Sequence, residues 1–333
     1  MPEVRVLGSD DVAGLASYAD YVDAVREGYR QVGEGAPAKP RTSLTSADPP
    51  GFLTAYMAIL PETGAMGTYT YAAGFGAEDA HFLLPLFDAD SGEPLALFDG
   101  ASMNPYKTGA AGAVGVDALA REDAAELAVI GSGSQARAQV AATATVRNLD
   151  RVRVYSPTPE SRASFAAEFD DRLRTAAVSA VDSPAAAVAD ADIVITATRA
   201  TEPVFDGDDL AEGAHVTAMG QYSPDAREVD GTTVARAKYV PDLRARADLE
   251  TGDAGAYIQA VREGAVDADH LHAELGEVVA GTEPGRTSST EVTLFDSGGT
   301  GIETVAAAGM LYERAREQDL GETISVTPAS EAF

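Results

Sequence analysis

Hydrophobic positions in the second half of the chain alternate between two spacings. Short apolar runs of strand length are followed repeatedly by segments whose apolar residues recur with helical periodicity. This alternation of strand and helix is typical of a parallel sheet covered by helices on both faces. The expected strands are 127–130, 151–155, 175–177, 193–197, 214–219, 239–241 and 293–295, and the expected helices are 134–148, 160–169, 184–189 and 255–263. The pattern therefore predicts an α/β fold with a Rossmann-type, doubly wound parallel sheet.

The N-terminal part of the chain is patterned differently. A helix is expected over 20–31, and β-rich sequence interrupted by Gly- and Asp-containing turns follows it. The expected strands are 52–59, 66–72, 81–87 and 95–98. A helix over 110–121 is apolar nearly all round, which indicates burial. A last helix over 303–317 can return to this N-terminal region.

Length and pattern together indicate two domains. The chain has 333 residues, more than one typical core accommodates. We expect an α/β domain of residues 1–118 with 303–333, and a Rossmann domain of residues 119–302. No internal repeat is visible, so repeat architectures are not expected.

A glycine turn follows the first strand of the expected Rossmann domain. The run Leu127–Ile130 ends at Gly131, and an Ala-rich helical pattern starts two residues after Gly133. Gly131 can adopt the backbone angles of a tight turn, Gly133 lets the main chain approach a pyrophosphate, and Ala136 permits close helix packing. The expected cofactor contacts at this turn are Gly131, Ser132, Gly133, Ser134 and Gln135. This context favours a dinucleotide site over an ordinary Gly-rich turn.

The strong excess of acidic residues makes polyanionic partners unfavourable. There are 24 Lys and Arg against 53 Asp and Glu, a formal net charge of −29, and cysteine is absent. Such a surface repels nucleic acid and anionic membranes, so neither is an expected partner. Neither a secretory signal nor an apolar run of ~18 residues is visible, and we expect a cytoplasmic protein.

Lysine is nearly absent from this acidic sequence. The lysines are Lys39, Lys107 and Lys238. An acidic surface with few lysines is typical of a high-salt cytosol such as that of haloarchaea, where ~1 M salt shortens the Debye length to about 3 Å. We therefore expect stability that increases with salt, and a specific role for some of the remaining lysines.

Six short motifs, taken in chain order, carry a resemblance to a known family. They are Lys39–Arg41, Phe87–Gly100, Lys107–Ala111, Val129–Ala136, Ile195–Thr198 and Phe295–Gly299. In these motifs the chain resembles the ornithine cyclodeaminase/mu-crystallin family, which also contains alanine dehydrogenases and ketimine reductases. The resemblance implies a homodimer. It also implies that the N-terminal part and the C-terminal helix form a substrate-binding and dimerisation domain.

The resemblance assigns roles to three residues of the N-terminal motifs. Arg41 matches an arginine that holds the substrate carboxylate, a role suited to the planar fork of a guanidinium. The alternative for Arg41 is a surface ion pair. Lys107 stands where the family usually has a second arginine, and keeps the charge without the fork. Thr108 matches a threonine that contacts a cofactor phosphate.

Two positions depart from the family pattern. Tyr69 falls at the place of the family's catalytic lysine, and Tyr222 at the place of the cyclodeaminases' catalytic aspartate. A phenol of pKa about 10 can donate a proton but is a poor base near neutrality. The alternative is that both tyrosines only pack. Asp225 and His215 lie near enough in sequence to substitute as acid or base.

The end of the second Rossmann strand bears on the choice of cofactor. An acid there would hold the ribose 2′-OH of NAD, but Ser156, Thr158 and Arg162 follow the strand instead. Hydroxyls with an arginine suit a 2′-phosphate, which favours NADP(H) over NAD(H). The alternative is a helix start capped by Thr158. The resemblance implies further cofactor contacts by Ala197, Thr198, Met219, Ser297, Gly298 and Gly299.

Three functions remain open on these residues. The first is an oxidoreductase that moves hydride between NAD(P)H and a small amino, imino or keto acid, with a tyrosine as proton donor. The second is a cyclodeaminase lyase that releases ammonia and recycles its bound NAD. The third is a cofactor-binding protein that has lost catalysis. The histidines His81, His215, His270 and His272 form no convincing metal signature, so no metal is expected.

Overall fold

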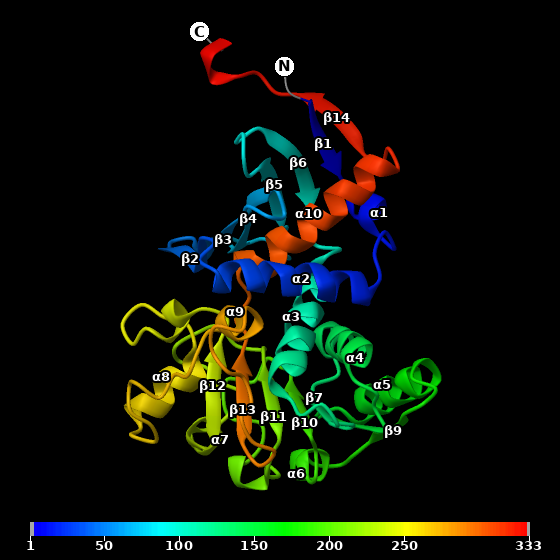
Figure 1. Cartoon of the computed structure of the whole chain (residues 1–333), viewed down its shortest axis with the longest axis vertical. Coiled ribbons are helices and arrows are strands. Elements are labelled where there is room, and N and C mark those ends of the chain that lie inside the picture. The colour runs from blue at the N-terminus through cyan, green and yellow to red at the C-terminus, as the bar shows by residue number, and fades with distance from the viewer. Residues whose placement is uncertain (1–2, 332–333) are drawn as a thin grey trace. The chain divides into compact units, whose positions relative to one another are not determined.

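The computed structural model describes residues 3–331, which fold as two compact units (Figure 1). The first unit contains the chain up to Lys107 and again from Gly299 onward, and the second contains Thr108–Gly298. The chain therefore changes unit before the expected boundaries at 118/119 and 302/303. The reason is that helix α3 (Asn104–Leu119) contributes only its first turn to the first unit.

The second unit is built on a seven-stranded sheet in which every neighbouring pair is parallel. Its order is β12-β13-β11-β10-β7-β8-β9. The strands are β7 (Glu126–Ile130), β8 (Arg151–Tyr155), β9 (Ala177–Ala180), β10 (Ile193–Thr196), β11 (His215–Ala218), β12 (Ala237–Pro241) and β13 (Val292–Asp296). The expected strand 175–177 is shifted to β9, because pairing with β8 starts at Ala177. The Rossmann-type sheet is confirmed.

Strand order reverses next to β7. From β7 the chain builds outward through β8 to β9, then returns to place β10 on the other side of β7. In sheets of this kind, ligands bind outside the carboxyl ends of the strands at such a switch point. The loops that follow β7 and β10 are therefore the first place to look for a site.

Helices accompany this sheet, and apolar side chains cover both of its faces. They are the rest of α3, α4 (Ser134–Val146), α5 (Pro159–Arg172), α6 (Pro184–Val188), α7 (Gly231–Arg236), α8 (Gly255–Arg262) and α9 (Leu275–Val279), with 3₁₀ turns η1 (Gly207–Asp209) and η2 (Arg244–Ala247). In β7, Leu127 and Val129 join one buried apolar cluster while Ala128 and Ile130 join another. Burial on both faces explains why the strand is an unbroken apolar run. Among the described residues, no helix is long and apolar enough to span a membrane.

The first unit is built on a mixed sheet of order β14-β1-β6-β5-β4-β3-β2. All neighbouring strands are antiparallel except β1 and β6, which are parallel. The strands are β1 (Glu3–Leu7), β2 (Ala38–Ala47), β3 (Pro50–Leu60), β4 (Ala65–Gly74), β5 (Leu83–Asp88), β6 (Pro94–Asp99) and β14 (Glu322–Ser325). The sequence did not predict β1, β2 or β14. Strand β2 is polar and contains Pro40, which an edge strand tolerates because one side needs no ladder donor.

Helices α2 (Tyr18–Gly33) and α10 (Gly301–Glu317) pack against each other, and α10 lies on β3 and β4 (Figure 1). The helices approach closely at Gly28, where a Cβ would lie 2.9 Å from the Cβ of Ala306. Short helices α1 (Ser9–Val12) and η3 (Ala329–Glu331) lie near the ends of the chain. Helix α10 corresponds to the last helix expected from the sequence, and it lies in the same unit as the N-terminal region.

Strand β3 carries apolar side chains on both faces of the sheet. Tyr56 and Leu60 are buried on the face under α10, whereas Leu53, Met57 and Ile59 alternate with them and remain 38–49% exposed. A strand with two apolar faces indicates two buried environments. Within this unit only one of the two faces of β3 is covered.

Candidate functional site

The glycine turn lies at the carboxyl end of β7, beside the end of β10. Gly131 has a φ of 120°, and a Cβ there would overlap the carbonyl oxygen of Ala197. Gly133 is the N-cap residue of α4, and a Cβ there would meet no atom within 4 Å. The fold itself therefore requires Gly131, whereas Gly133 leaves open space at the start of a helix. Open space beside backbone N–H groups at a helix N-terminus fits a pyrophosphate.

The next strand end supplies the side chains expected to discriminate between cofactors. The hydroxyl of Ser132 donates to that of Ser156 at 3.0 Å, and Arg162 donates to the Ser156 carbonyl oxygen at 2.9 Å. The other guanidinium nitrogen of Arg162 pairs with the exposed Asp182 at 2.6 Å. Thr158 occupies the N-cap position of α5, but its side chain makes no capping hydrogen bond. The alternative that Thr158 serves as a helix cap therefore lacks the hydrogen bond from the threonine side chain to a backbone N–H of the first turn.

The buried acid Glu228 joins the ends of β10 and β11. One of its oxygens accepts from the backbone N–H and the hydroxyl of Thr198, both at 2.7 Å. The other accepts from Thr196 at 2.9 Å and from the Gly220 N–H at 2.6 Å. Burial raises the pKa of the Glu228 carboxyl, and the four donors oppose that shift. The sequence did not single out Glu228, although it holds Thr198 in place at the switch point.

Tyr222 and the acids or bases expected near it lie in different surroundings within this unit. Tyr222 is 47% exposed, and Asp225 lies 3.7 Å from Arg262 in an exposed ion pair. His215 begins β11, at the amino end of the strand, and is completely buried between hydroxyls of Thr217 and Thr293 at 2.9 Å. Burial lowers the pKa of His215 to about 3. The expectation that His215 substitutes as acid or base is wrong, because the ring is neutral, sealed and at the opposite strand end.

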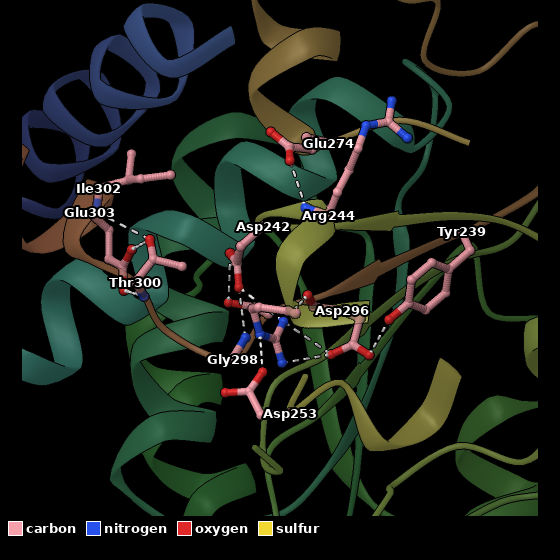
Figure 2. Close-up of polar contacts among 12 residues, drawn as sticks. Tyr239, Asp242, Arg244, Asp253, Glu274, Asp296, Gly298, Thr300, Ile302 and Glu303 are labelled. Atoms are coloured by element: carbon pink, nitrogen blue, oxygen red, sulfur yellow. Dashed lines mark hydrogen bonds and ion pairs between the residues drawn. The ribbon is translucent and has the colours of Figure 1, made fainter. Parts of the chain in front are cut away.

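A buried arginine cluster follows β12 and β13 (Figure 2). Arg246, fully buried, donates to Asp253 at 2.8 Å, to Asp242 at 3.2 Å and to the carbonyl oxygen of Asp296 at 2.7 Å. Asp242 also accepts from the Gly298 N–H at 2.7 Å. A Cβ on Gly298 would overlap the guanidinium, so this position must be glycine. The cluster holds the backbone at Ser297 and Gly298, two of the expected cofactor contacts. The sequence pattern did not predict this cluster.

Of the remaining expected cofactor contacts, Met219 follows the end of a strand, and Thr108 and Gln135 lie near the starts of helices, all in the second unit. Met219 continues β11, and its N–H donates to the Thr196 carbonyl oxygen at 3.2 Å. The Thr108 carbonyl oxygen accepts from Gln139 on α4 at 2.8 Å, so α3 and α4 are linked near the glycine turn. Gln135 is half-buried on the first turn of α4. Gly299 belongs to the first unit, not to the Rossmann unit with Ser297 and Gly298.

In the first unit, a β-bulge determines where Arg41 points. Lys39 pairs with Met57 and Thr42 with Ala55, so β2 contains one extra residue between these pairs. The extra residue moves Arg41 to the face opposite Lys39, the face of the sheet under α10. The Arg41 guanidinium accordingly lies 4.8 Å from the ring centre of Tyr56. The bulge places Arg41 over buried aromatics rather than on the open face.

Tyr69 lies at the centre of an aromatic stack on the same face. Its ring stacks on Tyr56 at 5.7 Å and on Phe82 at 5.2 Å, and its hydroxyl donates to the Gly100 carbonyl oxygen at 3.1 Å. The side chain is 1% exposed, and burial raises the pKa of the Tyr69 phenol. Tyr69 is therefore neutral across the physiological range, and its proton is already used in a hydrogen bond.

Lys107, on the first turn of α3, contacts both the stack and α10. Its ammonium lies 5.1 Å from the ring centre of Tyr69 and 3.4 Å from an oxygen of Glu303. Lys107 is only 3% exposed, which is unusual for lysine and excludes a solvated surface role. A Cβ on Gly299 would lie 3.6 Å from Glu303 and 3.9 Å from Arg41. Two cations, a carboxylate and two tyrosines thus converge in the first unit.

The structure brings the sequence-predicted residues together in two sets. Arg41, Tyr69, Lys107 and Gly299 belong to the first unit, and the glycine turn with the other expected cofactor contacts belongs to the second. Among residues 3–331, no cluster of His, Asp or Glu has the arrangement of a metal site. The sequence analysis did not single out Glu303. The spacing Thr300-x-x-Glu303 is typical of a capping box and could have identified this residue.

Comparisons with known proteins agree with this architecture. A Delta(1)-pyrroline-2-carboxylate reductase of Bacillus cereus is 37% identical over 250 residues, 75% of each chain. The structure of Thermococcus litoralis Delta(1)-pyrroline-2-carboxylate reductase with NADH and L-proline has a TM-score of 0.88 and 32% identity, covering 96% of this chain and 100% of that one. An archaeal alanine dehydrogenase dimer with bound NAD has a TM-score of 0.87 and 30% identity, covering 98% of this chain and 100% of that one.

The relatives confirm the class of function expected from the sequence, since they are NAD(H)-dependent reductases or dehydrogenases of imino and amino acids. They do not establish a preference for NADP over NAD. The model of the ornithine cyclodeaminase/mu-crystallin family matches residues 3–319, and nearly the whole described chain lies within that match. On its motifs, its parallel sheet and this match, the chain belongs to the ornithine cyclodeaminase/mu-crystallin family.

Proposed function

We propose that this protein reduces a small cyclic imino acid to the corresponding cyclic amino acid with a nicotinamide cofactor. The observation that supports this proposal is the position of two buried or half-buried cations over stacked aromatic rings. Arg41 lies over Tyr56, and Lys107 lies over Tyr69. Cations suit a carboxylate, and aromatic faces suit a flat, largely apolar ring. Pyrroline-2-carboxylate, named in the relatives above, combines both features.

Each residue of the first unit has one task in this proposal. Arg41 binds the carboxylate, and Lys107 adds a second positive charge that orients it. Tyr69 supports Tyr56 and Lys107 from within the stack and does not supply a proton, because it is buried and its hydroxyl already donates to Gly100. When bound, the reduced nicotinamide supplies a hydride to the imine carbon. The ring nitrogen gains or retains one proton, so imine, reduced cofactor and one proton become amine and oxidised cofactor.

An alanine dehydrogenase is the second candidate. Its support is the similarity to an archaeal alanine dehydrogenase over 98% of this chain. That reaction also needs a carboxylate anchor, but not a surface for a ring. The cyclodeaminase reaction ranks below both, because the place of its catalytic aspartate holds the exposed Tyr222.

We propose NADP(H) in preference to NAD(H). The strand end after β8 holds Ser156, Thr158 and Arg162, whereas NAD-specific sites place a carboxylate there. The pair between Arg162 and the 98%-exposed Asp182 is solvated and contributes little. A 2′-phosphate can replace Asp182 as the partner of Arg162. The related complexes named above hold NADH or NAD, so the proposed preference differs from the cofactors seen in them.

We also propose that the chain forms a homodimer through the uncovered face of the β2–β4 sheet. Leu44 and Leu53 are paired across β2 and β3 and are 72% and 49% exposed, and Met57 and Ile59 continue the same face. The similar archaeal alanine dehydrogenase is a dimer. A second copy with the same apolar face would bury both patches symmetrically.

The first prediction concerns the substrate. NADPH or NADH oxidation, followed by absorbance in buffer with added salt, is expected to be fastest with Δ1-pyrroline-2-carboxylate or its six-membered homologue. Pyruvate with ammonia is the comparison, and a higher kcat/KM for it would make the protein an alanine dehydrogenase. Ammonia release from ornithine without net cofactor turnover would instead support the lyase.

The second prediction concerns the carboxylate anchor. Arg41→Ala is expected to raise KM for the imino acid by at least about tenfold, because a charge-assisted bidentate bond is lost. Arg41→Lys should recover part of that loss, since charge without the fork remains. Arg26→Ala, a surface arginine of α2, is the matched control. An unchanged KM in Arg41→Ala would remove Arg41 from the site.

The third prediction concerns the cofactor. Arg162→Ala is expected to weaken NADPH binding about tenfold and to leave NADH binding unchanged, because only NADPH carries the 2′-phosphate. Fluorescence titration of both cofactors measures this. Tighter NADH binding by the unmodified protein would overturn the NADP(H) preference, and equal losses for both cofactors would show that Arg162 is structural.

The fourth prediction concerns the dimer. Leu44→Asp with Leu53→Asp places charges on the paired apolar positions and is expected to yield monomers, as measured by light scattering after size exclusion. Leu249→Asp changes an exposed leucine of the second unit and should remain dimeric. A monomeric unmodified protein, or a dimer that survives the double change, contradicts the assigned face.

A further inference from the structure

Lys107 and Glu303 form an ion pair that is removed from solvent. Their side chains are 3% and 2% exposed, and the ammonium nitrogen lies 3.4 Å from Glu303 Oε1. A buried ammonium is stable only beside compensating charge and hydrogen bonds, because burial alone favours the neutral amine. The Glu303 carboxylate is a negative charge that faces Lys107 at ion-pair distance.

The Glu303 carboxylate is held in place independently of Lys107. Oε1 accepts from the Thr300 N–H and Oε2 accepts from the Thr300 hydroxyl, both at 2.7 Å (Figure 2). The bond from the Thr300 N–H belongs to the capping box at the start of α10, where the helix dipole also favours negative charge. The carboxylate is therefore preorganised at the start of α10.

Other charged or titratable groups on the surrounding elements include Tyr56 of β3, Tyr69 and Tyr71 of β4, Asp99 of β6 and Arg41 of β2. Tyr69 is neutral because burial raises the pKa of its phenol. Asp99 accepts from the Ser9 hydroxyl at 2.6 Å and from the Ala101 N–H at 3.1 Å, so each of its carboxylate oxygens already has a hydrogen-bond donor. The guanidinium of Arg41 lies over the Tyr56 ring. None of these groups takes over the position of Glu303 beside the ammonium.

We propose that Glu303 is a positioning residue that keeps Lys107 charged and aimed for a substrate carboxylate. The inference rests on the proposed function in one respect, the role of Lys107 as the second cation for the carboxylate. It adds a residue on α10 to the substrate site and explains how a lysine works at a position with almost no solvent. Glu303 acts through Lys107 and does not itself contact the substrate.

The proposal has a consequence for pH that a purely structural role lacks. Without Glu303, the buried amine loses its proton at a lower pH, so the second cation disappears as pH rises. An arginine at position 107 keeps its charge without help from Glu303. Binding of a carboxylate should thus become pH-sensitive in Glu303→Gln, and lose that sensitivity when Lys107→Arg is added.

The test is calorimetric binding of pyrrole-2-carboxylate, a flat ring acid that cannot accept hydride, to the full-length protein with cofactor present. Relative to the unmodified protein, Glu303→Gln should bind about equally well near pH 6 and about tenfold more weakly near pH 9. Lys107→Arg with Glu303→Gln should restore a flat profile. In turnover, Glu303→Gln should raise KM at high pH with a smaller effect on kcat.

Glu313→Gln is the matched control, because it removes an exposed carboxylate of the same helix that pairs with Arg316. It is expected to keep the pH profile of the unmodified protein. If Glu303→Gln does not fold, Glu303→Asp moves the charge one methylene away and should show a partial loss that grows with pH. Complete insensitivity of Glu303→Asp would then overturn the proposal.

The outcomes separate this inference from the proposed function. A pH profile of Glu303→Gln parallel to that of the unmodified protein, or an equally steep profile in the double variant, overturns the role of Glu303 even if imine reduction is observed. Pyrrole-2-carboxylate binding with the expected pH behaviour but no imine reduction leaves Glu303 in its role and overturns the function. Failure of the unmodified protein to bind the probe overturns the role.

Discussion

The close approach of two strand ends, β7 and β10, is the constraint on which the second unit depends. Gly131 lies against the carbonyl oxygen of Ala197 in a backbone conformation that side chains other than glycine rarely adopt. That contact lets the chain turn from β7 directly into α4 at the switch point of the sheet. Glu228 then secures the same edge by binding Thr198 and Gly220. Gly133 follows this turn at the N-cap of α4, where a Cβ would meet no atom within 4 Å.

The first unit places two positively charged side chains in buried or half-buried positions of a very acidic chain. Arg41 and Lys107 lie over tyrosine rings, and Lys107 also meets the Glu303 carboxylate. Aromatic faces and one fixed carboxylate stabilise these cations while limiting competition from the many surface acids. The scarcity of lysine in the sequence was a useful signal for Lys107. Lys238, by contrast, pairs with Glu291 in a structural role.

Local signals in the sequence predicted the parallel sheet and the glycine turn because both depend on periodicity and on glycine chemistry within a few residues. The same signals failed for β2, a polar edge strand that exists only through pairing with β3. They also failed for His215, since sequence proximity to Tyr222 says nothing about the end of the strand at which a residue lies. The Arg246 cluster had no local pattern, because its acids come from three separate segments.

The sequence by itself determined the fold class and the glycine turn after β7, and it singled out the two cations that we expect at a carboxylate. Those properties follow from spacing, from residue chemistry and from family motifs. Only the tertiary structure decided that a bulge turns Arg41 toward Tyr56, that Tyr69 is sealed and neutral, and that Glu303 faces Lys107. The physical reason is that side-chain direction and burial depend on register and packing between distant segments, which no local pattern encodes.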